Sequence, residues 1–281
     1  MSVKRRAYLS CLLQVIRTLE EPTAAALAFG LHRKSNVNHI LVYDLGGGTL
    51  DVSLLFVNDG SVEVIGSDGD DNLGGSDFDQ CVAHVLADKL QGSLVTLEDA
   101  ADAIPCHFDT PTCALHNLYP LSEATRRQLT DSETSRVTCM SFLDDKSASR
   151  QRRSLRSETT DTNSEEFAGG GGLRTTAEAN GPQRGRAQDC GLWEPSNLEL
   201  TRTEYEQQCT SLFSRGLAPV SRLLDRLDLT PDDIDEVVMV GGMTRTPRVR
   251  ELLKEHLLVD RLNVEIDPDI VVAYGAATVA H

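Results

Sequence analysis

A glycine-rich segment with flanking carboxylates, Asp44–Ser53, holds the residues best suited to chemistry. Apolar runs on either side, Ile40–Tyr43 and Leu54–Val57, predict two strands joined by Gly46–Gly48. Because glycine has no Cβ and adopts positive φ without steric cost, three in a row let a ligand come close to the backbone. The segment predicts a phosphate-binding loop, and the alternative is a plain hairpin turn.

Asp44 and Asp51 stand at the two ends of this loop and would repel a bare phosphate. A hydrated Mg²⁺ between them would remove the conflict, since Mg²⁺ keeps several of its waters. The Thr49 hydroxyl and the loop N–H groups would then face the phosphate oxygens. We therefore predict a magnesium–phosphate site.

A second unit of strand, glycine turn and helix lies near the end of the chain. The strand is Val237–Val240, the turn begins at Gly241 and Gly242, and the helix carries Val249 through Leu257. In open α/β sheets ligands bind beyond the carboxyl ends of the strands. The two glycine turns are therefore expected to border one crevice.

Other elements follow from capping and periodicity. Pro22 and Gly30 bracket a short helix, and the acidic Glu20 and Glu21 before it either complement the helix dipole or orient a water or hydrated metal. A hairpin is predicted at Asn58–Gly60. Further predicted elements are a helix after Leu73–Asp77, a helix capped by Thr201–Glu204, a strand near Val264–Ile266 and a helix from Asp269 to Val279.

Charge and cysteine content limit the partners and the compartment. With 43 acidic and 27 basic residues the formal charge is −16, which disfavours nucleic acid and anionic membranes as partners. Seven cysteines, odd in number and irregularly spaced, favour free thiols in a reducing compartment. A metal site at Cys106, His107, Cys113 and His116 is disfavoured by its spacing.

Two segments stand apart from this pattern. Met1–Ile16 superficially resembles a signal peptide, but it lacks a small-residue cleavage site, and a core helix or strand is favoured. Asp145–Cys190 is rich in Gly, Ser, Thr and Arg and is predicted to be a disordered insertion. Its arginines, Arg150–Arg156, are interpreted as a solvated loop rather than a docking patch.

Five motifs together resemble the nucleotide-binding domain of the heat-shock protein 70 family, in family order. They are Glu21–Ala26, Asp44–Ser53, Leu73–Asp79, Val240–Arg245 and Asp267–Ala277. The resemblance implies an α/β fold, an actin-like ATPase (ribonuclease H-like) second lobe with an inserted α+β subdomain. The domains implied are 1–73 and 191–281 for the lobe, 74–144 for the inserted subdomain and 145–190 for the disordered insertion.

The resemblance also implies a role for individual residues. Asp44 resembles the carboxylate beside the magnesium ion and the attacking water, Thr49 a phosphate-facing threonine, and Glu21 an acidic residue that orders the catalytic water. The residues expected to contact the nucleotide are Gly46, Gly47, Gly48, Thr49, Glu123, Arg126, Arg127, Gly241, Gly242, Arg245 and Asp269. Arg127 and Arg245 would sandwich the adenine, an arrangement that favours binding by stacking.

Departures from the family pattern leave the activity open. Met243 stands where the family has serine near the base, either crowding the pocket or filling the core, and the family's first phosphate loop and its lysine have no counterpart before Met1. The resemblance implies an ATP-binding chaperone that uses ATP or ADP with Mg²⁺, acts in protein folding and the stress response, and works with co-chaperones and nucleotide exchange factors. The alternative is a non-catalytic nucleotide- or co-chaperone-binding module, and a sugar or metabolite kinase is disfavoured. The expected location is the cytoplasm, with the endoplasmic reticulum lumen as the alternative.

Overall fold

The computed structural model describes residues 17–90, 110–142 and 193–279. Its contacts divide the chain into two compact units. The first unit comprises Met1–Val85, Ser122–Ser135 and Leu200–His281, and the second comprises Leu86–Leu121 and Arg136–Glu199. The predicted core segment at the N-terminus and the predicted insertion at 145–190 lie outside the described residues, and the predicted domain boundaries stay predictions.

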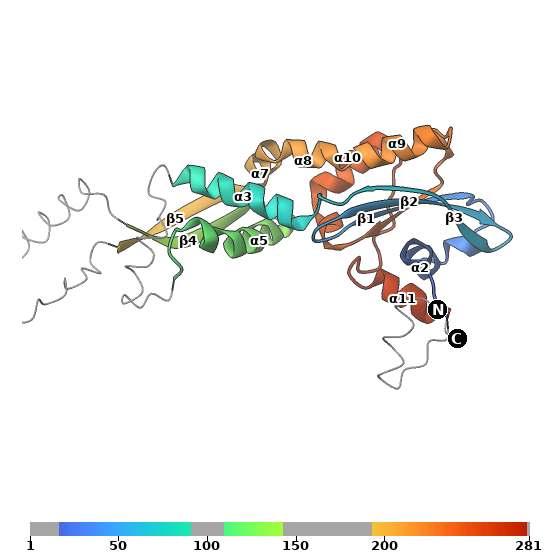
Figure 1. The fold of residues 1–281 in the computed structure, drawn as a ribbon, viewed down its shortest axis with the longest axis horizontal. Coiled ribbons are helices and arrows are strands. Elements are labelled where there is room, and N and C mark those ends of the chain that lie inside the picture. Colours follow the sequence, from blue (N-terminus) through green and yellow to red (C-terminus); the bar gives the residue numbers. More distant parts are fainter. Residues whose placement is uncertain (1–16, 91–109, 143–192, 280–281) are drawn as a thin grey trace, which may run out of the picture. The chain divides into compact units, whose positions relative to one another are not determined.

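The described chain contains strands, α-helices and short 3₁₀ helices (Figure 1). The strands are β1 (His39–Leu45), β2 (Leu50–Asn58), β3 (Ser61–Asp70), β4 (Thr134–Phe142), β5 (Trp193–Thr201) and β6 (Glu236–Val240). The α-helices are α2 (Glu21–Ala28), α3 (Gly75–Lys89), α5 (Leu115–Asp131), α7 (Arg202–Gln208), α8 (Thr210–Arg215), α9 (Ala218–Arg226), α10 (Pro247–Leu257) and α11 (Val271–Thr278). The 3₁₀ helices are η1 (Leu31–Arg33), η3 (Pro231–Asp233) and η4 (Gly242–Arg245).

The first unit is built on a four-stranded mixed sheet in the order β3-β2-β1-β6. Strand β1 pairs antiparallel with β2 and parallel with β6. The register sets Asp44 opposite Asp51 on one side and opposite Val240 on the other. Both predicted glycine turns therefore leave the sheet at the same edge, as the crevice prediction requires.

Helices cover both faces of this sheet (Figure 1). Helices α2 and α11 pack on one face around a core that includes Ala25, Ile40 and Val271. Helices α8, α9 and α10 lie on the other face, where the Tyr43 hydroxyl donates to the Gly216 carbonyl at 3.1 Å. Strand β1 is thus buried on both sides, which explains its nearly continuous apolar sequence.

Helices α2 and α11 cross at very close range. A Cβ placed on Gly275 of α11 would lie 1.8 Å from the Ala24 carbonyl oxygen of α2. Only glycine allows the two backbones to approach this closely. The alanine-rich sequence of α2 therefore serves contact with α11 as well as helix propensity.

Turns and caps formed largely as predicted. Asp59 and Gly60 both have positive φ, 49° and 78°, and join β2 to β3. Thr201 caps α7 by accepting a hydrogen bond from the Glu204 N–H at 3.1 Å. Helix α5, however, already begins at Leu115, in a stretch where prolines obscured the helical period.

The predicted strand at Val264–Ile266 is wrong. The chain makes one isolated parallel bridge there, between Val238 and Asn263. Asn263 uses its N–H and its carbonyl to pair with β6, and the pairing then ends. Pro268 follows closely and has no N–H with which to continue a ladder.

The expectation of free thiols is also wrong, because the structure contains two disulfide bonds among the described cysteines. Cys81 of α3 is bonded to Cys209 in the first unit, across a sequence separation of 128 residues. Phe78 and Phe213 pack nearby at 4.9 Å between ring centroids and hold the same two segments together. Sequence spacing cannot reveal a pairing that depends on long-range packing.

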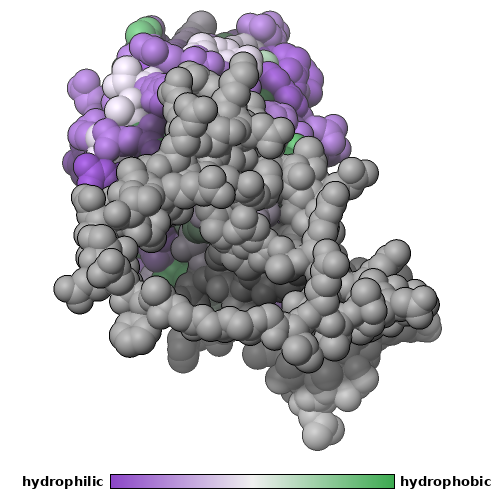
Figure 2. All heavy atoms as spheres, turned by 90° about the vertical axis from the view of Figure 1, so that its left-hand side faces the viewer, coloured by the Kyte–Doolittle hydropathy of each residue, from purple (hydrophilic) through white to green (hydrophobic). Residues whose placement is uncertain are grey.

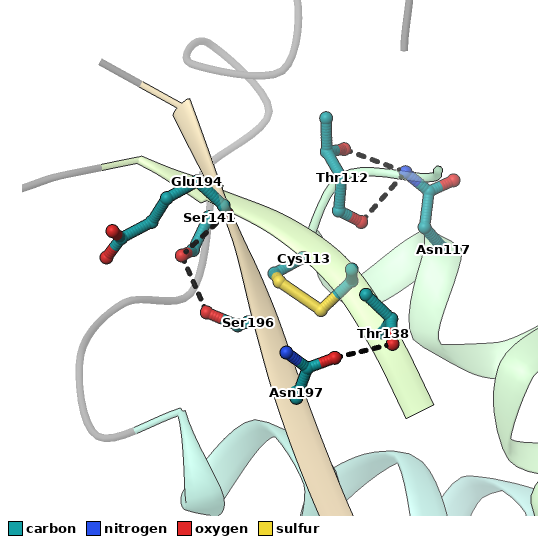
Figure 3. The surroundings of a disulfide bond; sticks show 9 residues. Thr112, Cys113, Asn117, Thr138, Ser141, Glu194, Ser196 and Asn197 are labelled. Carbon is teal, nitrogen blue, oxygen red and sulfur yellow. Dashed lines mark hydrogen bonds between the residues drawn. A yellow bond between two sulfur atoms is a disulfide. The ribbon is translucent and has the colours of Figure 1, made fainter. Parts of the chain in front are cut away.

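The second disulfide bond, Cys113–Cys139, lies in the second unit beside a two-stranded sheet (Figure 3). On this sheet, β4 and β5 are joined by hydrogen bonds between side chains: Thr138 donates to Asn197 at 2.8 Å, and the Ser141 and Ser196 hydroxyls are 2.7 Å apart (Figure 3). Of the other members of the disfavoured Cys–His cluster, Cys106 and His107 lie outside the described residues, and His116 lies on α5.

Helices within the described ranges are all too short or too polar to cross a membrane. In the view of Figure 2, the described residues that can be seen are mainly hydrophilic, with few apolar side chains among them. Such a surface is typical of a face in contact with water.

Candidate functional site

The glycine loop is a tight hairpin turn between β1 and β2, closed by a hydrogen bond from the Gly46 N–H to the Thr49 carbonyl at 3.0 Å. Contrary to the sequence argument, none of its three glycines has positive φ. A Cβ on Gly47 or Gly48 would meet no atom within 4 Å. Packing within the protein therefore does not require glycine at these two positions, and the open space in front of the loop can take a ligand.

The first turn of α3 supports this loop from behind. Gly75 and Ser76 donate their N–H groups to the carbonyls of Gly46 and Gly47, at 3.0 and 2.8 Å. A Cβ on Gly74 would lie 2.3 Å from the Gly48 nitrogen, so backbone packs directly on backbone. Within the described residues, the N–H groups of Gly47 and Gly48 have no hydrogen-bond acceptor. These groups can therefore bind an anion.

Acidic side chains gather at the base of the loop. Burial, followed by the charges of Asp51 and Glu21, raises the pKa of Asp44 to about 6. The Thr49 hydroxyl donates to Asp51 at 3.3 Å. Gly241, with φ of 83°, lets Asp44 approach, because a Cβ there would lie 2.8 Å from a carboxylate oxygen of Asp44.

A magnesium ion fits this donor set. Cross-strand carboxylates that face each other repel, and a divalent cation between them would favour the ionised form of both. Within the described ranges, no three Asp, Glu, His or Cys side chains come close enough to hold a metal by themselves. The site therefore suits an ion that keeps most of its waters and is bound through one or two carboxylates and a phosphate, as Mg²⁺ prefers.

A pocket of about 990 Å³ opens beside the glycine loop, entirely within the first unit. The residues predicted from sequence that line it are Gly46, Gly47, Glu123, Arg126, Arg127, Gly242, Arg245 and Asp269. The other predicted residues are not part of this lining: Glu21, Asp44, Gly48, Thr49, Asp51 and Gly241. The predicted residues therefore fall into two groups: those that line the pocket, and a group around Asp44 and Asp51 that does not.

Several arginine side chains of the pocket lining are paired with carboxylates. Arg126 of α5 is buried and forms a two-pronged ion pair with Asp79 of α3, with nitrogen–oxygen distances of 2.6 and 3.4 Å. One residue further along α5, Arg127 is exposed and pairs with Glu123 at 2.8 Å. The same helix therefore supplies one arginine that holds the wall together and one that is available to a ligand.

The lining also contains Arg245, on η4. Its guanidinium pairs with Asp267 and, at 3.1 Å, with Asp269. Gly242 lies against Asp269, since a Cβ on it would be 3.0 Å from a carboxylate oxygen. These contacts hold Arg245 in the lining of the same pocket as Arg127.

Sequence reasoning missed several residues of the lining. Asp79 was part of a recognised motif but was given no role, although it anchors Arg126. Met243, for which the sequence left pocket and core as alternatives, is part of the lining but is only 3% exposed and packs against Gly75, with its sulfur 3.5 Å from where a Cβ would lie, so it is largely a core residue. The remaining missed residues are Gly75, Ser76, Thr130, Asp131, Pro247, Arg250 and Glu251. Helical spacing from Arg126 would have indicated Thr130, while Arg250 carries no sequence signal.

Comparison with known proteins agrees with this geometry. The family model described as "Hsp70 protein" matches residues 6–105 and 188–281. The chain is 36% identical over 265 residues to the "Chaperone protein DnaK" of Prochlorococcus marinus (strain MIT 9515), which covers 94% of this chain and 33% of that protein. It is 35% identical over 270 residues to the "Stromal 70 kDa heat shock-related protein, chloroplastic" of Pisum sativum, covering 95% of this chain and 30% of that protein.

The chain therefore spans about a third of the length of these curated relatives. Its mixed α/β architecture fits the actin-like ATPase fold. With a family model that matches well over half of its residues, the chain belongs to the heat-shock protein 70 family.

Proposed function

We propose that this chain is a nucleotide-binding lobe of an Hsp70-like chaperone, and that it takes ATP or ADP with Mg²⁺. The observation that carries the proposal is one pocket whose lining contains both the glycine loop, with its free N–H groups, and two arginines from different elements, Arg127 of α5 and Arg245 of η4. Phosphates suit the loop N–H groups and a planar base suits the guanidinium groups. The names of the relatives support a chaperone role.

In this proposal each residue has a defined task. Gly46 and Gly47 let the phosphates reach the loop, and Arg127 and Arg245 stack on the two faces of the base. Glu123 lies beside the ribose, with Arg126 held next to it by Asp79. Asp269, which is bound to Arg245, fixes the orientation of that guanidinium.

The acidic group serves the phosphate end. Asp44 and Asp51 would hold the waters of a magnesium ion, and the ion would neutralise phosphate charge when bound. A half-buried carboxylate such as Asp44 can accept a proton from an attacking water, and Glu21 would orient that water. Thr49 would donate its hydroxyl to a phosphate oxygen in place of its present bond to Asp51.

The finer fold assignment belongs to the same proposal. The mixed sheet of β1, β2, β3 and β6 is interpreted as the ribonuclease H-like core of the lobe. The second unit, with β4 and β5, is interpreted as the inserted α+β subdomain. Co-chaperones and nucleotide exchange factors are the proposed protein partners.

The alternative is a non-catalytic module that binds a nucleotide or a co-chaperone. This alternative is favoured because, among the described residues, the acidic group of Asp44, Asp51 and Glu21 has no basic residue beside it that could contact a transferred phosphoryl group. Catalysis of phosphoryl transfer needs charge neutralisation from several sides. Steady-state release of phosphate from ATP, measured with the chain and with an Asp44→Asn variant, separates an ATPase from a binding module.

The compartment remains a proposal as well. Disulfide bonds persist in oxidising compartments and are rare in the cytoplasm. Cys81–Cys209 and Cys113–Cys139 therefore favour the endoplasmic reticulum lumen, or another oxidising space, over the predicted cytoplasm.

A Gly47→Ala variant tests the proposed phosphate site. The new methyl group meets nothing in the protein within 4 Å, so thermal unfolding without nucleotide should be unchanged. It would occupy the space proposed for phosphate, and calorimetry should show ADP binding weakened by about tenfold or more. Equal ADP affinity in both proteins would contradict the proposed position of the phosphates.

A further inference from the structure

Helix α3 contributes Gly75, Ser76 and Asp79 to the lining of the pocket. The N–H groups of Gly75 and Ser76 donate to the glycine loop, at 3.0 and 2.8 Å. Asp79 pairs with the Arg126 guanidinium of α5, with 2.6 Å between Oδ1 and Nε. The shape of the loop and the position of Arg126 therefore depend on where the first turns of α3 lie.

A disulfide bond holds these same turns of α3. Cys81 comes shortly after Asp79 on the helix, and its bond to Cys209 ties α3 to the junction of α7 and α8. The same two segments also meet through Phe78 and Phe213, at 4.9 Å between ring centroids. Aromatic packing opens and closes thermally, whereas a covalent bond lets the two segments separate only after it has been reduced.

The two disulfide bonds of the described chain differ in burial. Cys209 is fully buried, but its partner Cys81 is half-buried. In the other bond Cys113 and Cys139 are both fully buried. Because a disulfide bond that a reductant can reach exchanges with thiols more readily than a buried one, Cys81–Cys209 should be reduced first.

We propose that the Cys81–Cys209 disulfide bond is a redox switch for the pocket, and that the oxidised chain binds nucleotide more tightly than the chain reduced at this bond. The inference rests on the proposed nucleotide site and adds a regulation to it. Its physical basis is pre-organisation: with the bond intact α3 is already ordered, whereas after reduction the ligand has to order α3 and binds more weakly by that cost.

The reaction partner is a dithiol. One of its thiolates attacks the Cys81 sulfur, which breaks the bond to Cys209 and forms a mixed disulfide with Cys81. Cys209 leaves as a thiolate and takes up a proton. The second thiol of the partner loses its proton and attacks the mixed disulfide, so that Cys81 leaves as a thiolate and is protonated in turn. Two electrons thus pass to the chain, and the partner becomes a disulfide.

The test is calorimetry with ADP and Mg²⁺ on the oxidised chain and on the chain reduced by dithiothreitol, with alkylation and mass spectrometry to identify the reduced cysteines. The ADP dissociation constant should rise by at least about fivefold on reduction. Linkage requires the reciprocal effect: in a fixed mixture of reduced and oxidised dithiothreitol, bound ADP should lower the equilibrium constant for reduction of Cys81–Cys209 by the same factor.

Two double variants make the result specific. Cys81→Ala with Cys209→Ala lacks the bond and should bind ADP as weakly as the reduced chain, with or without dithiothreitol. Cys81→Ala alone breaks the same bond without altering the buried Cys209, and it replaces the double variant if that does not fold. The matched control, Cys113→Ala with Cys139→Ala, lacks the other bond and should show the same shift on reduction as the unchanged chain.

Hydrogen exchange reads the position of α3 without any nucleotide. The amide hydrogens of Gly75 and Ser76 should exchange faster in the reduced chain than in the oxidised chain, because their bonds to the loop carbonyls open more often. The control variant without Cys113 and Cys139 should show the same increase.

The outcomes are distinct. Equal ADP affinity in both states, with Cys81 and Cys209 shown to be reduced, overturns the switch and leaves the nucleotide site intact. A shift on reduction that persists without Cys81 and Cys209 assigns the effect to other cysteines and overturns the switch as well. If the oxidised chain binds no ADP, the proposed function fails; faster exchange of Gly75 and Ser76 on reduction would then still support redox control of α3, and unchanged exchange would refute it.

Discussion

Asp44→Asn should stabilise the chain in the absence of divalent cations. In the folded chain, burial and the charges of Asp51 and Glu21 raise the pKa of Asp44 from 3.8 to about 6. An ionised Asp44 is therefore unfavourable in the folded state relative to the unfolded state. Asparagine keeps the shape of the side chain and removes the charge.

The size and the pH window of the effect follow from the same pKa. A raised carboxyl pKa means that the folded chain binds the Asp44 proton more tightly than the unfolded chain does. Protonation of Asp44 therefore stabilises the folded chain fully below about pH 4, less as the pH rises, and not at all above about pH 6. The complete difference corresponds to about 3 kcal/mol of unfolding free energy. The variant should gain about 1 kcal/mol over the unchanged chain at pH 4.5 and about 3 kcal/mol at pH 7.5.

The assay is urea unfolding of both proteins at several values between pH 4.5 and 8, with a metal chelator present. Asp71→Asn, which removes a carboxylate from an exposed position of the turn after β3, is the control for the loss of one negative charge. If Asp44→Asn is neutral or destabilising at pH 7.5, or if its gain does not grow with pH, Asp44 is not the strained carboxylate that the site requires.

Two other variants test the role of Met243 and that of the Cys81–Cys209 disulfide bond. Met243→Ser should lower the free energy of unfolding by about 2 kcal/mol, because the buried methionine leaves a cavity next to Gly75; unchanged stability with tighter ADP binding would instead mean that Met243 obstructs the pocket. Replacing Cys81 and Cys209 together by alanine should cost about 2–4 kcal/mol in urea unfolding without reductant, and dithiothreitol should remove most of this difference. A variant as stable as the parent in both conditions would show that this disulfide does not stabilise the folded chain.

The sequence was most informative where local pattern and backbone geometry coincide. Apolar runs predicted β1, β2 and β6, and the rule that ligands lie beyond the carboxyl ends of strands predicted that Gly46 and Gly242 share one pocket. Strand pairing then brought Asp44 opposite Asp51. These features depend on periods and turns that short stretches of sequence determine.

Features that depend on long-range packing could not be predicted. The Asp79–Arg126 pair and the Cys81–Cys209 disulfide bond join segments far apart in the chain. The glycines of the loop were expected to need positive φ, whereas the glycine that the loop requires is Gly74, where a methyl group would collide with the loop backbone. The order of residues does not indicate which of several adjacent glycines makes such a contact.

The Cys81–Cys209 disulfide bond also determines how the molecule responds to cleavage of its backbone. It joins α3, in the first third of the chain, to the segment between α7 and α8, near the start of the last third. Any peptide bond between these two cysteines can be cut and the two pieces stay one covalent molecule. A protease that cuts within residues 143–192 would therefore leave a single species under non-reducing electrophoresis, and the same sample would separate into fragments once the disulfide is reduced. In an oxidising compartment the two sequence halves of the pocket, Gly46 and Gly47 from one piece and Arg245 from the other, would stay tethered after such a cut.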